Sequence, residues 1–149
     1  MVKIKQGDLL EAAEDIIAHQ VNCHGVAGGL AAVIFDKYPA AHYDYWQLTQ
    51  RAAPWSLLGM AQVTGQQYDG HIICNLYGQY QPGADYRPDA LENALKQLAG
   101  IARNLGRSVA LPYKLSCGIC GGDWNQVQQI IKRAMKDVEC AIYQREEDQ

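Results

Sequence analysis

Apolar and polar positions along the chain follow two different periods, and each change of period separates an expected strand from an expected helix. Short runs that alternate, or that are continuously apolar, predict strands. Longer stretches with an apolar residue every three or four positions predict helices with one buried face. The expected strands cover residues 2–5, 15–21, 59–65, 71–76, 108–111 and 139–143, and the expected helices cover residues 9–13, 30–38, 41–51, 88–105 and 124–136.

Residues at the ends of these stretches support the boundaries. Pro88 suits the first helical position and Gly106 suits the position just after a helix. Pro39 interrupts the helical pattern that begins at residue 30. Asp8 and Asp123 each precede a helical stretch, where a carboxylate accepts hydrogen bonds from free backbone N–H groups.

Strands and helices alternate along the chain, with one hairpin expected around residues 68–70. Alternation of this kind is typical of α/β proteins, in which helices cover a sheet on both faces. The hairpin adds an antiparallel pair, so the sequence predicts a mixed sheet. With 149 residues and no linker or repeat, we expect a single domain over residues 1–149.

Composition narrows the range of partners. The net charge is −3 and lysine and arginine are scattered, so no general nucleic-acid binding is expected. No apolar stretch is long enough to span a membrane, and the first residues lack a signal-peptide pattern, so the expected location is cytoplasmic. Cys117 and Cys120 form a C-x-x-C pair, but a second pair and spaced histidines are missing, so neither a metal site nor a cofactor is expected.

Four aromatic residues lie close together in the sequence, three within the expected helix at residues 41–51 and one shortly after it. They are able to form a surface patch, but we expect core packing for at least half of them: Tyr43, Tyr45, Trp46 and Trp55.

Two glycine-rich turns, at residues 19–30 and 111–124, each follow a strand and open a helix. Glycine lets backbone N–H groups approach a ligand closely, and the helix dipole favours an anion there. One such turn is a weak signal. Two turns in one small domain indicate a ligand with more than one phosphate or ribose. The spacing G-x-G-x-x-G is missing after the first strand, which argues against a dinucleotide-binding Rossmann domain.

The order of three motifs resembles the macrodomains. These are Gly7-Asp8-Leu9-Leu10 after the first strand, the first turn from His19 to Ala31, and the second turn from Leu111 to Trp124. Two stretches, Asn75-Leu76-Tyr77-Gly78-Gln79 and Pro112 to Trp124, are specific for small bacterial and phage members. The resemblance covers nearly the whole chain and is nearest to the subgroup of ADP-ribose-1″-phosphate phosphatases and terminal ADP-ribose protein glycohydrolases, which includes small bacterial and phage members. It implies a three-layer αβα sandwich with a mixed six-stranded sheet and a cleft for ADP-ribose or its derivatives.

By this resemblance, Asp8 accepts a hydrogen bond from the adenine amino group, the Leu9 backbone touches the ring, and Tyr143 lies beside adenine. Asp8 is also a helix cap, and both roles are compatible because a cap leaves one carboxylate oxygen free. Tyr143 also fits as an ordinary half-buried strand residue. The remaining ligand-binding residues that the resemblance implies are Gln20, Ala27, Gly28, Gly29, Ser116, Cys117, Gly118 and Ile119.

The chain departs from the family pattern in three places. Residues 26–31 are one position short of Val-Met-Gly-x-Gly-x-Ala, Ser116 stands where the family has glycine, and residues 76–80 lack the lysine of the glycohydrolases. The last departure argues against a lysine-mediated route and favours the phosphatase branch.

For hydrolysis of ADP-ribose 1″-phosphate, the resemblance implies that Asn22 positions the ribose or phosphate, and that Asp123 acts as general base or as the group that orients the water. His24 is a candidate proton donor or a solvent-exposed loop residue. Two alternatives stay open: a non-catalytic ADP-ribose-binding module, and a hydrolase that removes ADP-ribose from protein or nucleic acid by substrate-assisted attack of water.

Overall fold

The computed structural model describes residues 1–146 and contains one mixed six-stranded sheet with the order β1-β6-β5-β2-β4-β3. Every neighbouring pair is parallel except β3 and β4, which are antiparallel. This confirms the predicted mixed sheet and its hairpin. The strands are β1 (Val2–Gln6), β2 (Ile16–Gln20), β3 (Ala61–Gln66), β4 (Ile72–Leu76), β5 (Val109–Pro112) and β6 (Cys140–Gln144).

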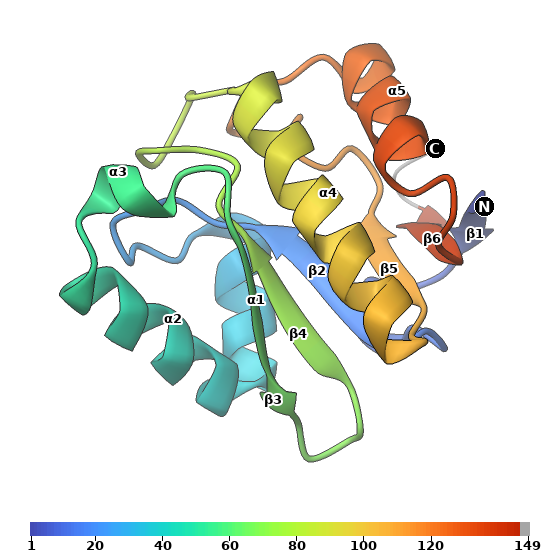
Figure 1. The fold of residues 1–149 in the computed structure, drawn as a ribbon, viewed down its shortest axis with the longest axis horizontal. Helices are drawn as coiled ribbons and strands as arrows, with labels where there is room; N and C mark the ends of the chain where they lie inside the picture. The colour runs from blue at the N-terminus through green and yellow to red at the C-terminus, as the bar shows by residue number, and fades with distance from the viewer. Residues whose placement is uncertain (147–149) are drawn as a thin grey trace.

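Helices cover both faces of this sheet, which gives the αβα sandwich (Figure 1). One core cluster lies between the sheet and the pair α4 and α5, and it includes Cys74 and Cys140 as small buried residues. The other cluster lies beneath α1 and α2. The helices are α1 (Gly29–Lys37), α2 (Pro39–Arg51), α3 (Pro54–Leu57), α4 (Pro88–Leu105) and α5 (Trp124–Ala134), with a short 3-10 helix η1 (Leu9–Glu11).

The predicted helix ends follow from local chemistry. The Asp8 carboxylate accepts a hydrogen bond from Leu10 N at 2.9 Å, and the Asp123 carboxylate accepts one from Asn125 N at 3.0 Å, so both are caps. Pro88 begins α4, and Gly106 follows it with φ 64°. An L-residue is strained in that left-handed conformation, whereas glycine adopts it freely.

Several details differ from the sequence prediction: α5 ends at Ala134 and not at residue 136, and η1 ends at Glu11 and not at residue 13. α3 was not expected, because a four-residue helix has too few positions to display a period. α2 begins two residues earlier than expected, with Pro39 as its first residue. Proline therefore both ends α1 and starts α2, since its fixed φ suits a first helical position. None of the helices in residues 1–146 is long and apolar enough to cross a membrane.

The sheet opens between its two central strands. β2 pairs with β4 along its whole length, but with β5 only at Ile16 and Ile17. Beyond these residues the chain leaves β2 toward α1 on one face, and leaves β5 toward α5 on the other. In α/β sheets, ligands bind at such a switch point, outside the carboxyl ends of the strands. The fold therefore places both glycine-rich turns at one crevice.

Candidate functional site

A continuous cleft runs along the carboxyl ends of β2, β5 and β6. It consists of two adjoining hollows of about 420 and 350 Å³, which share Leu30, Pro112 and Tyr113 as lining residues. Each volume falls in the range of small-molecule sites, roughly 300–1,000 Å³. We call them the η1 half and the turn half, after the elements at their outer ends.

The η1 half is lined by Asp8, Leu9 and Tyr143, the three residues that the resemblance places around adenine. The sequence prediction thus brought together residues from the two ends of the chain. They meet because β1 and β6 pair in parallel, with Gln6 opposite Gln144. The Asp8 oxygen that caps η1 is Oδ1, so the second oxygen of the carboxylate is left for a ligand.

Tyr143 is held in place by a buried carboxylate. Its hydroxyl donates to Glu14 Oε1 at 2.6 Å and accepts from Ala13 N at 3.2 Å. Glu14 is only 6% exposed and also accepts a hydrogen bond from Lys5 Nζ at 2.6 Å. Burial alone would raise the pKa of Glu14, but the hydrogen bonds from Lys5 and Tyr143 outweigh it and lower the pKa. The ring of Tyr143 therefore has one fixed orientation beside the cleft.

The turn half is bounded by a loop with two non-glycine residues in left-handed backbone geometry, Lys114 (φ 58°) and Ser116 (φ 68°). Such residues cost of order 1–3 kcal/mol each and cluster at ligand sites. Ser116 adopts a conformation that glycine adopts freely. Its hydroxyl donates to Gln20 Oε1 at 2.9 Å, and Gly122 N donates to its carbonyl oxygen at 2.9 Å.

Three glycines of the turn half face open space. A methyl group built on Gly28, Gly29 or Gly118 meets no protein atom within 4 Å. All three line the cleft, so their backbone is accessible to a ligand. Gly28 directly precedes α1, where the helix dipole favours negative charge. The arrangement is suited to an anion such as a diphosphate.

Gln20 and Gln79 join the floor of the turn half. Gln20 Nε2 donates to Gln79 Oε1 at 3.1 Å, while Gln79 Nε2 donates to the carbonyl oxygens of Gln81 and Gly83. Gln79 lies in the loop after β4, where the resemblance to macrodomains implies a lysine in the glycohydrolases. The side-chain amide of Gln79 is neutral and donates hydrogen bonds to its own loop, so residue 79 supplies no nucleophilic amine.

Five predicted site residues lie outside the cleft lining. Asn22 is buried and braces the first turn: its Oδ1 accepts from His24 N at 2.9 Å, and its Nδ2 donates to Val26 O at 2.7 Å. Asp123 is exposed and caps α5. The residues of this group are Asn22, His24, Ala27, Cys117 and Asp123, and those that do line the cleft are Asp8, Leu9, Gln20, Gly28, Gly29, Ser116, Gly118, Ile119 and Tyr143.

Sequence reasoning did not single out several lining residues. Lys114 lies within the second turn, and it is the one lysine among the described residues that line the cleft. Its left-handed conformation has no signature in the sequence, because lysine is ordinary at most positions. Tyr113 lies before it in the same motif. The other unpredicted lining residues are Leu10, His19, Leu30, Ala31, Val33, Gln79, Pro112, Leu115, Cys120 and Arg145.

Two aromatic rings, those of Trp55 and Tyr80, stack beside the loop that carries Gln79. Trp55 is 60% exposed and stacks on Tyr80 with ring centroids 3.6 Å apart, and the Arg87 guanidinium lies 5.4 Å from the Trp55 ring. The His24 ring meets the Tyr80 ring edge-on at 4.7 Å. The expectation of core packing for at least half of the four aromatic residues was wrong, since Tyr45 alone of the four is buried. Tyr43 and Trp46 fall on the outer face of α2, and α3 holds Trp55 outward.

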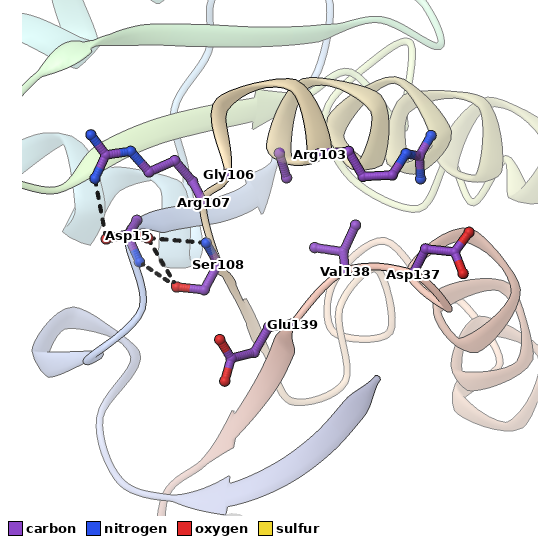
Figure 2. A pocket seen from close by; sticks show the side chains of 9 residues that line it. Asp15, Arg103, Gly106, Arg107, Ser108, Asp137, Val138 and Glu139 are labelled. Atoms are coloured by element: carbon purple, nitrogen blue, oxygen red, sulfur yellow. Dashed lines mark hydrogen bonds and ion pairs between the residues drawn. The ribbon is translucent and has the colours of Figure 1, made fainter.

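A separate hollow, of about 380 Å³, lies at the opposite edge of the sheet from the cleft, next to the amino ends of β2, β5 and β6 (Figure 2). There Asp15 Oδ2 accepts hydrogen bonds from the backbone N–H and the hydroxyl of Ser108, at 3.0 and 3.2 Å. Arg107 pairs with Asp15 at 3.7 Å. These contacts tie the starts of β2 and β5 together. No group of three or more metal-ligating side chains occurs in residues 1–146.

Comparison with known proteins agrees with this geometry. The model of the Macro domain family matches residues 18–131, so the chain belongs to the Macro domain family. The macrodomain of Mycobacterium tuberculosis DarG superposes with a TM-score of 0.84 at 30% identity, covering 96% of this chain and 97% of that structure.

Two curated relatives carry names of ADP-ribose hydrolases. A DNA ADP-ribosyl glycohydrolase of Mycobacterium tuberculosis is 32% identical over 150 residues, or 96% of this chain, which spans 42% of that relative's length. An ADP-ribose 1″-phosphate phosphatase of Scheffersomyces stipitis is 25% identical over 173 residues, and the match covers 96% of this chain and 99% of the relative.

Proposed function

We propose that this chain binds ADP-ribose across the cleft, with adenine in the η1 half and the diphosphate and distal ribose in the turn half. The observation that carries this proposal is the continuity of the two halves through Leu30, Pro112 and Tyr113. Asp8 offers an acceptor for the adenine amino group, and Tyr143 offers an aromatic face. Backbone N–H groups of the second turn at residues 116–119 hold the diphosphate, with the exception of Cys117 N, which donates to Lys114 O at 2.9 Å.

The proposed reaction is hydrolysis of the terminal phosphate of ADP-ribose 1″-phosphate. Water attacks phosphorus, the bond from phosphorus to the ribose oxygen breaks, and a proton reaches the departing oxygen. Two observations support a phosphatase over a lysine-dependent glycohydrolase: Gln79 in the loop after β4, and a yeast phosphatase that matches over almost its whole length. Lys114 supplies positive charge to the turn half.

The roles inferred from the resemblance remain part of the proposal. Asn22 positions the ribose or phosphate, Asp123 is the general base or the group that orients the water, and His24 is the proton donor. Asp123 caps α5 at the end of the second turn, and His24 lies within the first turn, so both belong to the two loops that bound the turn half.

Phosphate release from ADP-ribose 1″-phosphate tests this reaction. Asp123→Asn keeps a good helix cap and removes the base, so we expect unchanged thermal stability and ADP-ribose affinity with at least a 100-fold fall in kcat. Asp123→Ala is the control that loses the cap as well. If the wild type binds ADP-ribose but releases no phosphate, the phosphatase is refuted and the chain is a binding module. If Asp123→Asn keeps full activity, the base is another group.

A second candidate is removal of ADP-ribose from nucleic acid. It is favoured by the 32% identity to a DNA ADP-ribosyl glycohydrolase and by the Trp55–Tyr80 stack, because bases stack on exposed aromatic rings. Release of ADP-ribose from a modified oligonucleotide, lowered by Trp55→Ala while phosphate release is unaffected, would establish it. No release from the oligonucleotide would exclude it.

A further inference from the structure

His19, one of the residues that line the turn half, carries a buried hydrogen-bonding atom without a partner. The side chain lies in β2, is 1% exposed and is one of the residues that line the turn half. Its Nε2 lies 2.7 Å from Asn75 Oδ1. Its Nδ1 has no partner, and within residues 1–146 it is the one buried side-chain nitrogen or oxygen in that condition. Such an atom costs about 1–3 kcal/mol while it stays unpaired.

A chain of hydrogen bonds fixes which nitrogen carries the proton. Gln62 Nε2 donates to Asp44 O, so Gln62 Oε1 is the acceptor for Tyr77 Oη and for Asn75 Nδ2. Asn75 therefore turns its own oxygen toward His19, and Nε2 of His19 must be the N–H that donates to it. Nδ1 is left with a lone pair and no hydrogen. It is an acceptor.

Burial keeps this imidazole neutral. Desolvation lowers the pKa of His19 to about 4, and the hydrogen bond to Asn75 opposes this only partly. At neutral pH the ring therefore does not acquire a second proton, and Nδ1 keeps its lone pair. The ring is held edge-on against Phe35 of α1, with centroids 5.1 Å apart.

The lone pair is directed to the side of the ring away from β4. Nε2 points along the sheet to Asn75, the register partner of His19 on β4. The other side is where β2 has separated from β5, and there His19 shares the cleft lining with Gly28, Gly29 and Ala31. The neighbouring Gln20 is already engaged at both ends of its amide by Ser116 and Gln79.

We propose that Nδ1 of His19 accepts a hydrogen bond from the 2″ or the 3″ hydroxyl group of the distal ribose, and so selects a hydroxylated sugar over a deoxygenated one. The inference rests on the proposed binding of ADP-ribose, and it is independent of the reaction that follows. A site that hydrogen-bonds a substrate hydroxyl rejects the analogue that lacks it, because its own polar group is then left unpaired.

Calorimetry with ADP-ribose and with its 2″-deoxy and 3″-deoxy analogues tests the selection. For the wild type we expect one of the two analogues to bind about tenfold more weakly than ADP-ribose. His19→Phe keeps the ring shape, and should bind ADP-ribose and that analogue alike. His42→Phe is the matched control: His42 also contacts Phe35, lies outside the cleft lining and should leave the discrimination unchanged.

Nitrogen-15 NMR of the wild type gives a second readout that needs no variant to fold. Nδ1 of His19 should resonate as an unprotonated nitrogen, and should shift upfield on binding ADP-ribose but not on binding the weaker analogue. Equal affinity for all three ligands overturns the inference while leaving ADP-ribose binding intact, as does an equal shift with all three, which would make water the donor. A wild type that does not bind ADP-ribose refutes the proposed function itself.

Discussion

The two edges of the sheet each hold a hollow of similar size, yet they are built differently. At the amino edge, Asp15, Ser108 and Arg107 satisfy one another, and the hollow is the space around a structural clamp. At the carboxyl edge, the cleft contains open glycines, two non-glycine residues in left-handed geometry, and a buried nitrogen without a partner. Their volumes do not distinguish a ligand site from the space around a structural contact. Unsatisfied and strained groups distinguish the two hollows, because such groups cost free energy and persist mainly at functional sites.

The largest expected effect comes from exchanging a glycine at each edge for leucine. Gly118→Leu places a side chain in open space at the cleft, so we expect ADP-ribose affinity to fall by at least about 100-fold with little change in Tm. Gly106→Leu at the amino edge forces an L-residue to φ 64° and should cost about 1–2 kcal/mol of stability without changing affinity.

Calorimetry and thermal unfolding of both variants check this crossed pattern. If both variants lose affinity, or both lose only stability, the two edges do not differ in the way we describe.

The next effect is the pH dependence of stability that His19 imposes. Its pKa is about 4 in the folded chain and 6.5 in the unfolded chain, so the unfolded state binds the extra proton between these values. Stability therefore decreases as the pH falls from 6.5 to 4, by about 3 kcal/mol for this group.

Urea unfolding at pH 7, 5.5 and 4 measures the loss, and His19→Phe should flatten the curve in that window. Arg107→Ala at the amino edge should unfold with the wild-type pH dependence. A variant curve as steep as that of the wild type would assign the loss to other groups.

A smaller effect separates the two roles of Asp8. Serine caps a helix about as well as aspartate, so Asp8→Ser should keep Tm while ADP-ribose affinity falls about tenfold through loss of the acceptor for adenine. Asp8→Ala should lose the same affinity and about 1 kcal/mol of stability in addition. Retention of full affinity by Asp8→Ser would leave the residue as a cap alone, and denaturation together with calorimetry decides the matter.

The smallest effect is expected at the amino-edge ion pair. Arg107 and Asp15 are about half exposed at 3.7 Å, and exposed pairs of this kind contribute about 0–1 kcal/mol. Arg107→Ala should therefore unfold within 0.5 kcal/mol of the wild type, roughly the precision of the measurement, and should bind ADP-ribose normally. A loss of affinity would mean that the hollow in Figure 2 takes part in binding.

The fold was predictable because long amphipathic stretches and paired strands leave a period in the sequence. α4 begins at Pro88 and ends before Gly106 as predicted, since both ends are determined by residues with one strong conformational preference. α3 was missed because four residues carry no period. The caps Asp8 and Asp123 were predicted because capping depends on the next two or three residues alone.

The cleft was predictable only as far as its backbone motifs. Glycine-rich turns are recognisable in a sequence, whereas the left-handed backbone geometry of Lys114 and Ser116 is not. His19 was hidden inside an apolar strand, and its free nitrogen follows from Asn75 and Gln62, which belong to other strands. Asn22 was expected near the ligand, but its side chain braces the turn, a role that depends on where Val26 folds back.

A titration of the nitrogen-15-labelled chain with ADP-ribose, followed by backbone amide shifts, tests the central claim most directly. The account predicts saturable shifts at Leu9, Gly28, Ser116, Gly118 and Tyr143, which line the cleft, and unchanged signals at Gly106, Ser108 and Glu139, which line the opposite hollow. Saturable shifts confined to the amino edge, or no saturable shift at any residue, would contradict it.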